Sequence, residues 1–584
     1  MRWSNESIMK HKRQKNSFFL LAIFTLSVFF YFCFQLALMI VSEQSTILTH
    51  YLTLWGKTIL WLPLITLPYF LKDSLVELVK RKLESIIFFL DNFHWSLVVC
   101  FITLTITSLI ALFAYNAIPK TSDEVSLLFQ AKIFASGHWA APLPPLTEMF
   151  QLETTIVYNH RWFSMYQPGH SLMLAAGCLF GLPWLVGPLL STGSIFFTYR
   201  IAQSFYDETN ARLSTILLIS SPFFLLSGST YTVHNTSLFA LSFFTWMVIK
   251  YYKNNNPLLL LCAGIGLGLA FITRAYTALA YCLPIIAYGI YLSLKKELTS
   301  YVWFWIGLGF LPFFLFQLWN NFYLTGDALI FPYQLFLVKD YNSIGFGKMV
   351  GGILYGSQGH TFAKAFINFF YNLSVLSFHT FGWPLVSLLP FLIILFRKLS
   401  KTDAFVVSII FSQIIAYFFY WYNGVGFWGP RFYTEILPLL VILSIQGIRL
   451  VRLKGIPFFN YPVYPAWIMV FILILGAVLL YIPLEINFIK NSLWGCKPIP
   501  ALNTKPALVL VRNLPQDVPF AKTINMFIFP AAFNKNDPQL QGDVIYGKYL
   551  PNTPIEKIRV LFPFRSLYRL RYVNNTNTLE EITP

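Results

Sequence analysis

The chain has 584 residues, of which 56% are hydrophobic and 18% aromatic, and its mean hydropathy is +0.60. Soluble domains do not have this composition. Repeated apolar runs of about 20 residues, separated by short polar loops, predict a polytopic helical membrane protein. The formal net charge of +18 does not indicate nucleic-acid binding, because Lys and Arg lie mainly in short clusters between the apolar runs. The six cysteines show no CxxC or zinc spacing, so we predict neither a disulfide framework nor a structural metal.

The apolar runs predict about thirteen membrane spans. The N-terminus is basic and then apolar to about Met39 without a small-residue cleavage site, so we expect a retained first helix rather than a signal peptide. Two further apolar segments, 171–182 and 362–381, are shorter or interrupted, and we expect them to be interfacial or re-entrant. The predicted spans are 17–41, 51–71, 96–118, 184–205, 211–229, 235–251, 257–274, 277–294, 301–319, 384–397, 404–421, 433–450 and 465–484.

The charges between the spans predict an orientation. If the basic N-terminus is cytoplasmic, every second loop is short and basic, as the positive-inside rule requires. We therefore expect three regions: residues 1–95 with the first helices and a basic cytoplasmic loop, a membrane core at 96–484, and a C-terminal region at 485–584. The core carries two long outer loops, 119–183 and 320–383.

The C-terminal region has a different texture from the core. Short β-branched or aromatic runs are separated by Pro, Asn and Asp, which predicts strands in a small α+β domain outside the membrane. The runs are ALVLVR, NMFIFPAAF, DVIYGKYL, IRVLFPF and SLYRLRYV.

Two adjacent acids, Asp123 and Glu124, follow the predicted span 96–118. Thr121-Ser122-Asp123-Glu124 fits a capping box at the start of a helix. The following apolar stripe suits a helix at the membrane interface. The capping box explains the presence of Glu124. It explains Asp123 less well, because only one acid is needed to close the box. A carboxylate beside a low-dielectric surface can also act as a general base, so both the structural and the catalytic reading remain open for this pair.

Two arginines fall at the outer ends of predicted spans, where positive-inside logic disfavours them: Arg274 and Arg431. Each is either an interfacial anchor that snorkels or a phosphate ligand, because a guanidinium binds phosphate oxygens bidentately. Glu435 is an expected partner of one of them. The aromatic residues around Arg431, Trp428 among them, form either an interfacial belt or a platform for a sugar or lipid head group.

Weaker candidates lie on the same predicted face. His170, His234, Tyr166 and Glu435 are candidate acceptor or sugar contacts, although lone histidines are usually structural. Asp123 with His234 is a candidate site for a divalent cation, without any standard metal-binding spacing. Lys348 lies in the glycine-rich segment 342-NSIGFGKMVGG, a candidate lid with a candidate phosphate-binding lysine.

An ordered set of segments resembles the GT-C superfamily of membrane glycosyltransferases. The specific resemblance is to the protein O-mannosyltransferase-like branch, which includes bacterial lipid A aminoarabinose transferases. It spans roughly residues 115–575. The segments that carry it are 122-SDEVSLLFQAKIFASGHW, 161-RWFSMYQPGHSLMLAAG, 273-TRAYTALAYCLP, 320-NNFYLTGDALIFPYQLF, 429-GPRFYTEILP, 535-KNDPQLQGDVIYGKYL and 560-VLFPFRSLYRL.

This resemblance implies a GT-C fold in a bacterial inner membrane, with a periplasmic active site. The implied reaction is an inverting transfer of a sugar from a polyprenyl phosphate to a glycan, lipid or protein acceptor. Asp123 corresponds to the family's acid after its first conserved span, and Arg274 and Arg431 correspond to its phosphate-binding cations. Two alternatives remain. One is a lipid or polysaccharide transporter or flippase, and the other is a polymerase or ligase acting on lipid-linked glycans.

Overall fold

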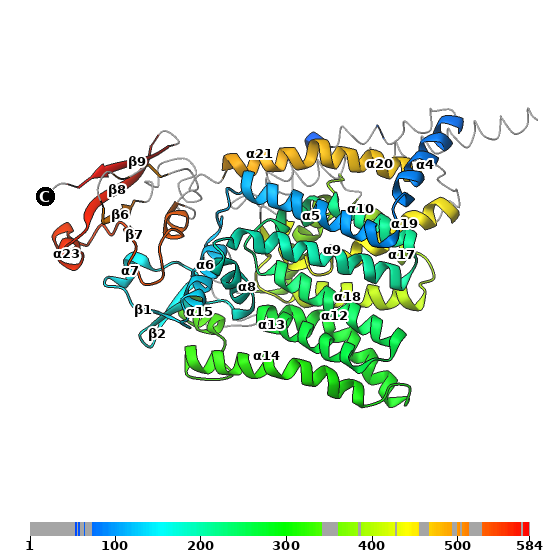
Figure 1. The fold of residues 1–584 in the computed structure, drawn as a ribbon, viewed down its shortest axis with the longest axis horizontal. Helices are drawn as coiled ribbons and strands as arrows, with labels where there is room; N and C mark the ends of the chain where they lie inside the picture. Colours follow the sequence, from blue (N-terminus) through cyan, green and yellow to red (C-terminus); the bar gives the residue numbers. More distant parts are fainter. Residues whose placement is uncertain are drawn as a thin grey trace, which may run out of the picture.

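The computed structural model describes residues 73–341, 360–383, 387–426, 429–454, 466–492, 505–512, 528–573 and 576–582, with a few isolated residues elsewhere. The predicted span 17–41, most of 51–71, Lys348 and Trp428 lie outside these residues. Long helices run side by side through the larger part of the molecule, and a β-sheet formed by the C-terminal region lies at one end of them (Figure 1).

The predicted helical membrane class is confirmed. The helices of the core are α5 (Asn92–Phe113), α9 (Val186–Phe205), α10 (Glu208–Ile219), α11 (Pro222–Gly228), α12 (His234–Asn254), α13 (Pro257–Leu294), α14 (Tyr301–Thr325), α16 (Phe362–His379), α17 (Leu389–Leu395), α18 (Lys401–Phe418), α19 (Leu437–Lys454), α20 (Ala466–Gly476) and α21 (Ile482–Ser492). Within the described ranges, five helical segments are long and apolar enough to cross a membrane, or six if the bent pair α10–α11 forms one span. The prediction of thirteen also counted shorter helices and residues outside the described part.

Two of the predicted spans form one helical element, α13, that reverses direction at Arg274. Arg274 has non-helical backbone angles, φ −153° and ψ 79°. A Cβ on Gly264 would lie 2.9 Å from the Cα of Gly309, and one on Gly289 would lie 2.8 Å from the ring of Trp303. In a straight helix the two glycines would be about 37 Å apart, whereas their partners in α14 are separated by only about 9 Å. The element therefore consists of two arms, which correspond to the spans predicted on either side of Arg274.

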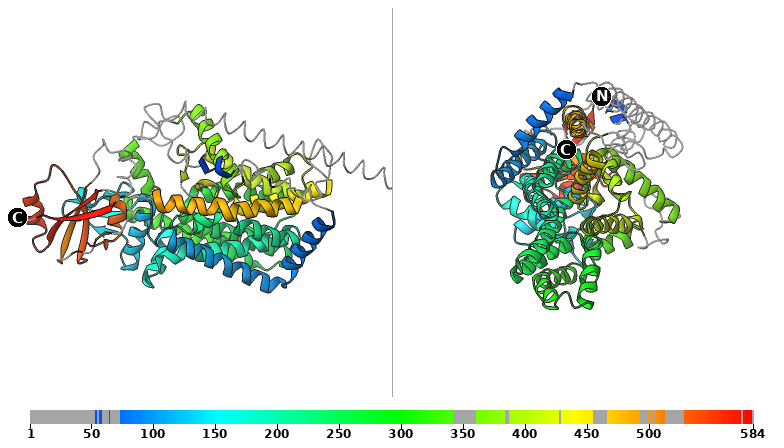
Figure 2. Two further views of the ribbon diagram at one scale, coloured as in Figure 1. Left: turned by 90° about the horizontal axis from the view of Figure 1, so that it is seen from above. Right: turned by 90° about the vertical axis from the view of Figure 1, so that its right-hand side faces the viewer.

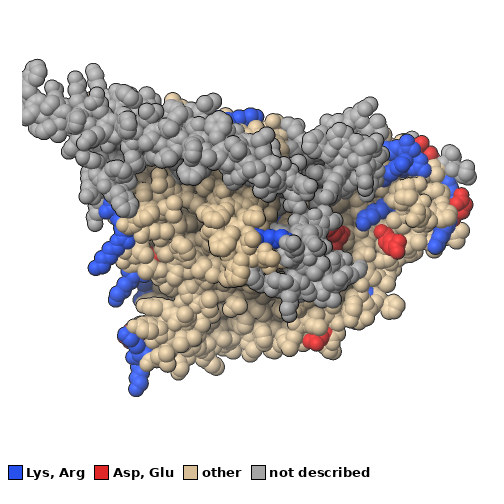
Figure 3. All heavy atoms as spheres, turned by 180° about the vertical axis from the view of Figure 1, so that it is seen from behind, with Lys and Arg blue, Asp and Glu red and all other residues tan. Residues whose placement is uncertain are grey.

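Charged residues avoid the middle of the bundle. On the face shown in Figure 3, Lys and Arg gather at the helix ends away from the C-terminal sheet and again on that sheet, and the band between them is almost free of charge. The amphipathic helix α4 (Asp73–Phe88), with its Lys80-Arg81-Lys82, lies at the first of these ends (Figure 2). An apolar band bounded by basic residues is the pattern of a multi-pass membrane protein.

A folded segment between α5 and α9 connects the bundle to the C-terminal region. It contains α6 (Ser122–Ala135), β1 (Ala141–Pro142), α7 (Thr147–Phe150), β2 (Thr155–Tyr158), β3 (Arg161–Ser164), α8 (Pro168–Leu179) and the short turn η2 (Pro183–Leu185). The three strands form an antiparallel sheet in the order β1-β3-β2.

Helix α6, which carries the acidic pair in its first turn, is covered by protein, whereas its apolar stripe predicted a helix at the membrane interface. Leu127 and Leu128 pack in one cluster with residues of α8 and α9. Phe129 and Ile133, on another side of the helix, pack in a second cluster with the C-terminal strands. Protein therefore covers α6 on both sides, so its apolar residues are core residues.

The C-terminal region contains the predicted α+β structure. Its strands are β6 (Ala507–Val511), β7 (Val544–Lys548), β8 (Ser566–Val573) and β9 (Thr576–Glu581), in the order β7-β6-β8-β9. Two of the five predicted strands are wrong: residues 528–533 are helical, and the IRVLFPF segment lies largely in helix α23 (Ile555–Leu561). The reason is topological, because β7 and β8 both run parallel to β6 and parallel strands require a crossover between them.

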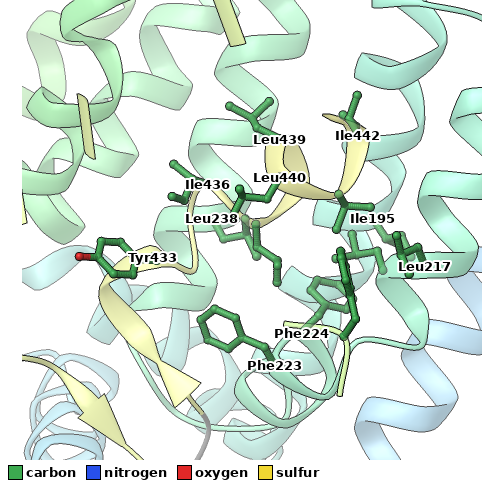
Figure 4. Close-up of a cluster of buried hydrophobic side chains, with 14 of the residues drawn as sticks. Ile195, Leu217, Phe223, Phe224, Leu238, Tyr433, Ile436, Leu439, Leu440 and Ile442 are labelled. Atoms are coloured by element: carbon green, nitrogen blue, oxygen red, sulfur yellow. The ribbon is translucent and has the colours of Figure 1, made fainter. Parts of the chain in front are cut away.

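One apolar cluster fixes the chain around Arg431. The short turn η4 (Arg431–Tyr433) follows the paired segments β4 (Val425–Gly426) and β5 (Gly429–Pro430) and leads into α19. Tyr433, Ile436 and Leu440 belong to one buried cluster with side chains of α9, α11 and α12, part of which is drawn in Figure 4. Because these residues are almost completely buried, the position of η4 is set by the core of the bundle.

Candidate active site

The predicted capping box is present at the start of α6. Thr121 is the N-cap and accepts a hydrogen bond from the Glu124 amide. Glu124 Oε2 accepts from the amides of Lys120 and Thr121 at 2.6 and 3.2 Å, and Oε1 accepts from the amide of Tyr231 at 3.2 Å. The Glu124 side chain is buried, and burial raises its pKa to about 7 although these amides favour the charged form. This geometry gives Glu124 a structural role at the helix start.

Asp123 has a different environment from its neighbour. Its carboxylate is 27% exposed, and Oδ2 accepts a hydrogen bond of 2.8 Å from Nη1 of Arg431. Burial alone would lower the pKa of the Arg431 guanidinium, but the Asp123 carboxylate raises it above its usual value. The two residues are 308 positions apart in the sequence. The predicted base and one predicted phosphate ligand therefore form one ion pair.

Arg274 lies at the reversal of α13 in a second polar cluster. Its Nε donates to Thr277 at 2.9 Å, and its Nη2 donates to the Tyr417 hydroxyl at 2.7 Å. Its Nη1 lies 3.3 Å from Nε2 of His234, and Nε lies 3.8 Å from Oε1 of Glu435. Side-chain polar groups from α12, α13, α18 and the segment before α19 thus hold the guanidinium of Arg274, whose side chain as a whole is 17% exposed.

The two arginine clusters meet at Phe432. The Arg274 guanidinium carbon lies 5.2 Å from the centre of the Phe432 ring, and that of Arg431 lies 5.8 Å from it. Both distances are within the range of a cation–π contact. The structure therefore brings Asp123, Arg431 and Arg274 into one region.

Two buried donors at this site have no partner among the residues that the structure describes. They are Nε of Arg431 and Nε2 of Gln167. Buried donors are nearly always satisfied in folded proteins, so an unsatisfied one requires an explanation. A ligand rich in acceptor oxygens, such as a phosphate, would satisfy them.

Tyrosines surround the ion pair. Burial raises the pKa of the Tyr166 hydroxyl well above its usual value, and the nearby Asp123 carboxylate and a hydrogen bond with it add to the rise. The Tyr422 ring lies 5.6 Å from the guanidinium carbon of Arg431. Tyr333, in α15 (Pro332–Tyr341), hydrogen-bonds Tyr420 at 2.9 Å. Hydroxyl groups and ring faces next to a charged pair are suited to binding a sugar.

Two predicted sugar or acceptor contacts are occupied within the protein. Both ring nitrogens of His170, which is completely buried, are hydrogen-bonded at 2.8 Å, one to the Thr236 hydroxyl and the other to the Tyr231 carbonyl. Glu435, also buried, faces His234 through Oε1 and accepts from Gln413 through Oε2 at 3.2 Å. These contacts give both side chains structural roles, and Glu435 contacts Arg274 rather than Arg431.

The residues suggested for a divalent cation do not fit one. An arginine can only donate, so Nε2 of His234 accepts from Arg274 and Nδ1 donates to Glu435. Neither nitrogen has a lone pair left for a metal, and Asp123 is paired with Arg431. Across the described ranges, no group of three or more His, Cys, Asp or Glu side chains could hold a metal ion.

Several residues of the site escaped prediction. Tyr417, Gln413, Tyr333 and Phe432 are ordinary aromatic or amide residues within apolar runs. Gln167 precedes Pro168 in a loop, and its contact with α13 depends on the tertiary structure. Only Phe432, which directly follows Arg431, had a signal in the sequence that could have identified it.

Comparisons with known proteins agree with this architecture. A family model described as "Dolichyl-phosphate-mannose-protein mannosyltransferase" matches residues 184–319. The structure of ArnT from Cupriavidus metallidurans bound to undecaprenyl phosphate is similar with a TM-score of 0.50 and 11% identity, over 82% of this chain and 93% of that one. The chain has the GT-C fold. The predicted resemblance to GT-C glycosyltransferases is thereby confirmed.

A curated relative and a further solved structure are more distant. The "Putative mannosyltransferase YkcB" of Bacillus subtilis (strain 168) is 22% identical over 189 residues, which are 32% of this chain. That match spans about a quarter of the relative's length (24%). An oligosaccharyltransferase from Archaeoglobus fulgidus has a TM-score of 0.44 and 13% identity, over 75% of this chain and 64% of that one.

Proposed function

We propose that this GT-C protein is a membrane glycosyltransferase that moves a sugar from a polyprenyl-phosphate donor to a glycan, lipid or protein acceptor. The observation that carries the proposal is the paired Asp123–Arg431 site beside Arg274. It combines a half-buried carboxylate with two cations, and one of these cations retains an unsatisfied buried donor. A sugar-1-phosphodiester requires this combination, with a base for the attacking hydroxyl and positive charge for the leaving phosphate.

The donor phosphate would bind between the two arginines. Arg431 uses Nη1 for Asp123, so its Nε remains available for a phosphate oxygen. Arg274 adds a second positive charge next to the same Phe432 ring. Preorganised charges of this kind stabilise the negative charge that develops on the leaving phosphate, and they act most strongly where water is excluded.

Asp123 would act on the acceptor. The acceptor oxygen attacks the anomeric carbon, its proton passes to the Asp123 carboxylate, and the bond from that carbon to the phosphate oxygen breaks. The polyprenyl phosphate leaves with the bonding electrons. Attack on the face opposite the phosphate inverts the anomeric centre. General-base catalysis of this kind contributes typically about 10²–10⁴-fold to the rate.

The comparisons support this assignment. The ArnT structure is bound to undecaprenyl phosphate. The curated relative is named as a mannosyltransferase. We extend a lipid-phosphate donor to this chain by analogy, because the ArnT structure is only 11% identical to it.

We place the site on the periplasmic face of a bacterial inner membrane. It lies at the bundle end next to the C-terminal sheet, opposite the basic helix ends (Figures 1 and 3). The positive-inside rule assigns those basic ends to the cytoplasm. The C-terminal region would then be periplasmic, and the polyprenyl chain of the donor would enter from the outer leaflet.

The gathering of polar residues at one end disfavours a transporter or flippase, which needs a site near the bilayer centre that is accessible from both sides. A polymerase or ligase for lipid-linked glycans shares the same lipid and face, and differs in the size of the donor. A transfer assay with purified protein and a panel of radiolabelled polyprenyl-phosphate and polyprenyl-diphosphate sugars decides among them. Product from a monophosphate donor supports the proposal, and transfer only from a diphosphate-linked oligosaccharide would favour the polymerase or ligase.

A further inference from the structure

A glutamine outside the predicted site holds the reversal of α13. Gln167 occupies the N-cap position of α8, but its side chain makes no capping hydrogen bond there. Instead, Oε1 of Gln167 accepts a hydrogen bond of 2.9 Å from the amide of Ala275, the residue directly after Arg274. The side chain therefore reaches from one helix start to another.

The start of α8 also packs closely against the residues before the reversal. A Cβ on Gly169 would lie 2.3 Å from Oγ1 of Thr273 and 2.9 Å from the backbone carbonyl of Ile272. Only a glycine allows this approach. The Gln167-Pro168-Gly169 segment thus contacts residues on both sides of Arg274.

The reversal needs such support. The first amides of a helix have no partner within the helix, and a side chain just before the helix usually caps them. Arg274 precedes the second arm of α13, and its own side chain bonds Thr277, His234 and Tyr417. A guanidinium only donates, so Arg274 cannot cap these amides itself, and Gln167 supplies a cap from another element.

We propose that Gln167 is a positioning residue: by capping the second arm of α13 through Ala275, it fixes the direction in which Arg274 presents its guanidinium. The identity of the ligand that Arg274 receives rests on the proposed function. The alternative is that Gln167 contacts the ligand itself through Nε2, its unpartnered buried donor.

Removing the hydrogen bond from either side separates these alternatives. Gln167→Leu removes the acceptor. Ala275→Pro removes only the donor, and the first position of a helix tolerates proline because its amide is otherwise an orphan. Arg274 already has a non-helical backbone, so a following proline does not have to move it out of the α conformation that proline disfavours in the preceding residue. The two variants and their double mutant are assayed for transfer from the polyprenyl-phosphate sugar that the wild type uses, and Gln167→Leu is repeated in an Arg274→Ala background.

We expect each single variant to lower kcat/KM for the donor by about three- to tenfold, the range for one lost hydrogen bond. The kcat/KM of the double mutant should be no lower than that of the less active single variant, since both changes remove the same hydrogen bond. In the Arg274→Ala background, Gln167→Leu should have no further effect. This last result distinguishes positioning of Arg274 from a general loss of structure.

Three results would overturn the inference. A loss with Gln167→Leu but not with Ala275→Pro would show that Gln167 contacts the ligand directly. Equal losses that persist in Arg274→Ala would show that the effect does not pass through Arg274. Unchanged kinetics in both variants would show that the bond has no role. Absence of transfer by the wild type would instead contradict the proposed function. In that case the melting temperatures of Gln167→Leu, Ala275→Pro and their double mutant are compared. If the shift of the double mutant equals the sum of the two single shifts, the inference is overturned, and a smaller shift supports it.

Discussion

The conformation of Gly429 determines where Arg431 lies, and Gly429→Ala tests this directly. Gly429 has φ +111°, and a Cβ there would lie 2.5 Å from Cδ2 of His379 and 2.9 Å from Cδ2 of Phe223. Both neighbours are completely buried and cannot move aside easily. Overpacking costs about 1–3 kcal/mol and the strained backbone about 1–3 kcal/mol more. We expect Gly429→Ala to lower the melting temperature by several degrees and to weaken binding of undecaprenyl phosphate.

Two matched controls separate the causes of this effect. Gly137 has φ +80° but open space around its Cβ position, so Gly137→Ala isolates backbone strain. Gly307 lies in α14 and has open space and no positive φ, so Gly307→Ala should leave the melting temperature unchanged or raise it slightly. The melting temperature is measured in detergent by intrinsic fluorescence. Binding of undecaprenyl phosphate is measured by the quenching of that fluorescence. A Gly429→Ala shift no larger than that of Gly137→Ala, with unchanged lipid binding, would refute the packing argument.

Three further predictions follow from the described contacts. Burial raises the pKa of Glu124 from an ordinary 4.5 to about 7, so between these pH values the folded state binds a proton that the unfolded state does not. The melting temperature of the wild type relative to Glu124→Gln should therefore fall as the pH rises from 4.5 to 7. A difference that stays constant over this pH range would contradict the prediction. Lys132→Met removes the hydrogen bonds from Lys132 to the carbonyls of Asn534 and Asn536. Limited proteolysis should therefore cleave the C-terminal region faster than in the wild type. An unchanged digestion rate would show that these hydrogen bonds do not hold the C-terminal region in place. Arg274→Lys keeps the charge but loses the fork of donors that bonds Thr277, His234 and Tyr417. We expect kcat/KM for the donor to fall by at least about tenfold, and full activity would remove Arg274 from the site.

The membrane class and the main elements were predictable from the sequence because hydrophobic runs and loop charges determine them. The capping box at Thr121–Glu124 was also readable, since it is a local pattern. The reversal at Arg274 was implied by two adjacent spans without a polar loop between them. The α23 crossover was missed because its segment has strand-like composition, and only the parallel pairing of β7 and β8 with β6 requires a helix there.

The candidate site was predictable only where charge is costly. Arg274, Arg431 and Asp123 were conspicuous because ionised groups are rare at a membrane boundary. Their arrangement was not: the sequence did not show that Arg431 pairs with Asp123 or that Glu435 holds Arg274. Uncharged residues such as Gln167 have no signal of their own, because their role depends on an amide more than 100 positions away.

The measurement that tests the central claim most directly compares wild type with Asp123→Asn in a transfer assay with radiolabelled polyprenyl-phosphate sugars. Asparagine keeps the size of the side chain and an oxygen for Arg431 but cannot accept a proton. We predict that Asp123→Asn binds undecaprenyl phosphate, keeps its melting temperature within a few degrees, and loses transfer by about 10²-fold or more. Undiminished transfer by Asp123→Asn would contradict the assignment of this carboxylate as the base.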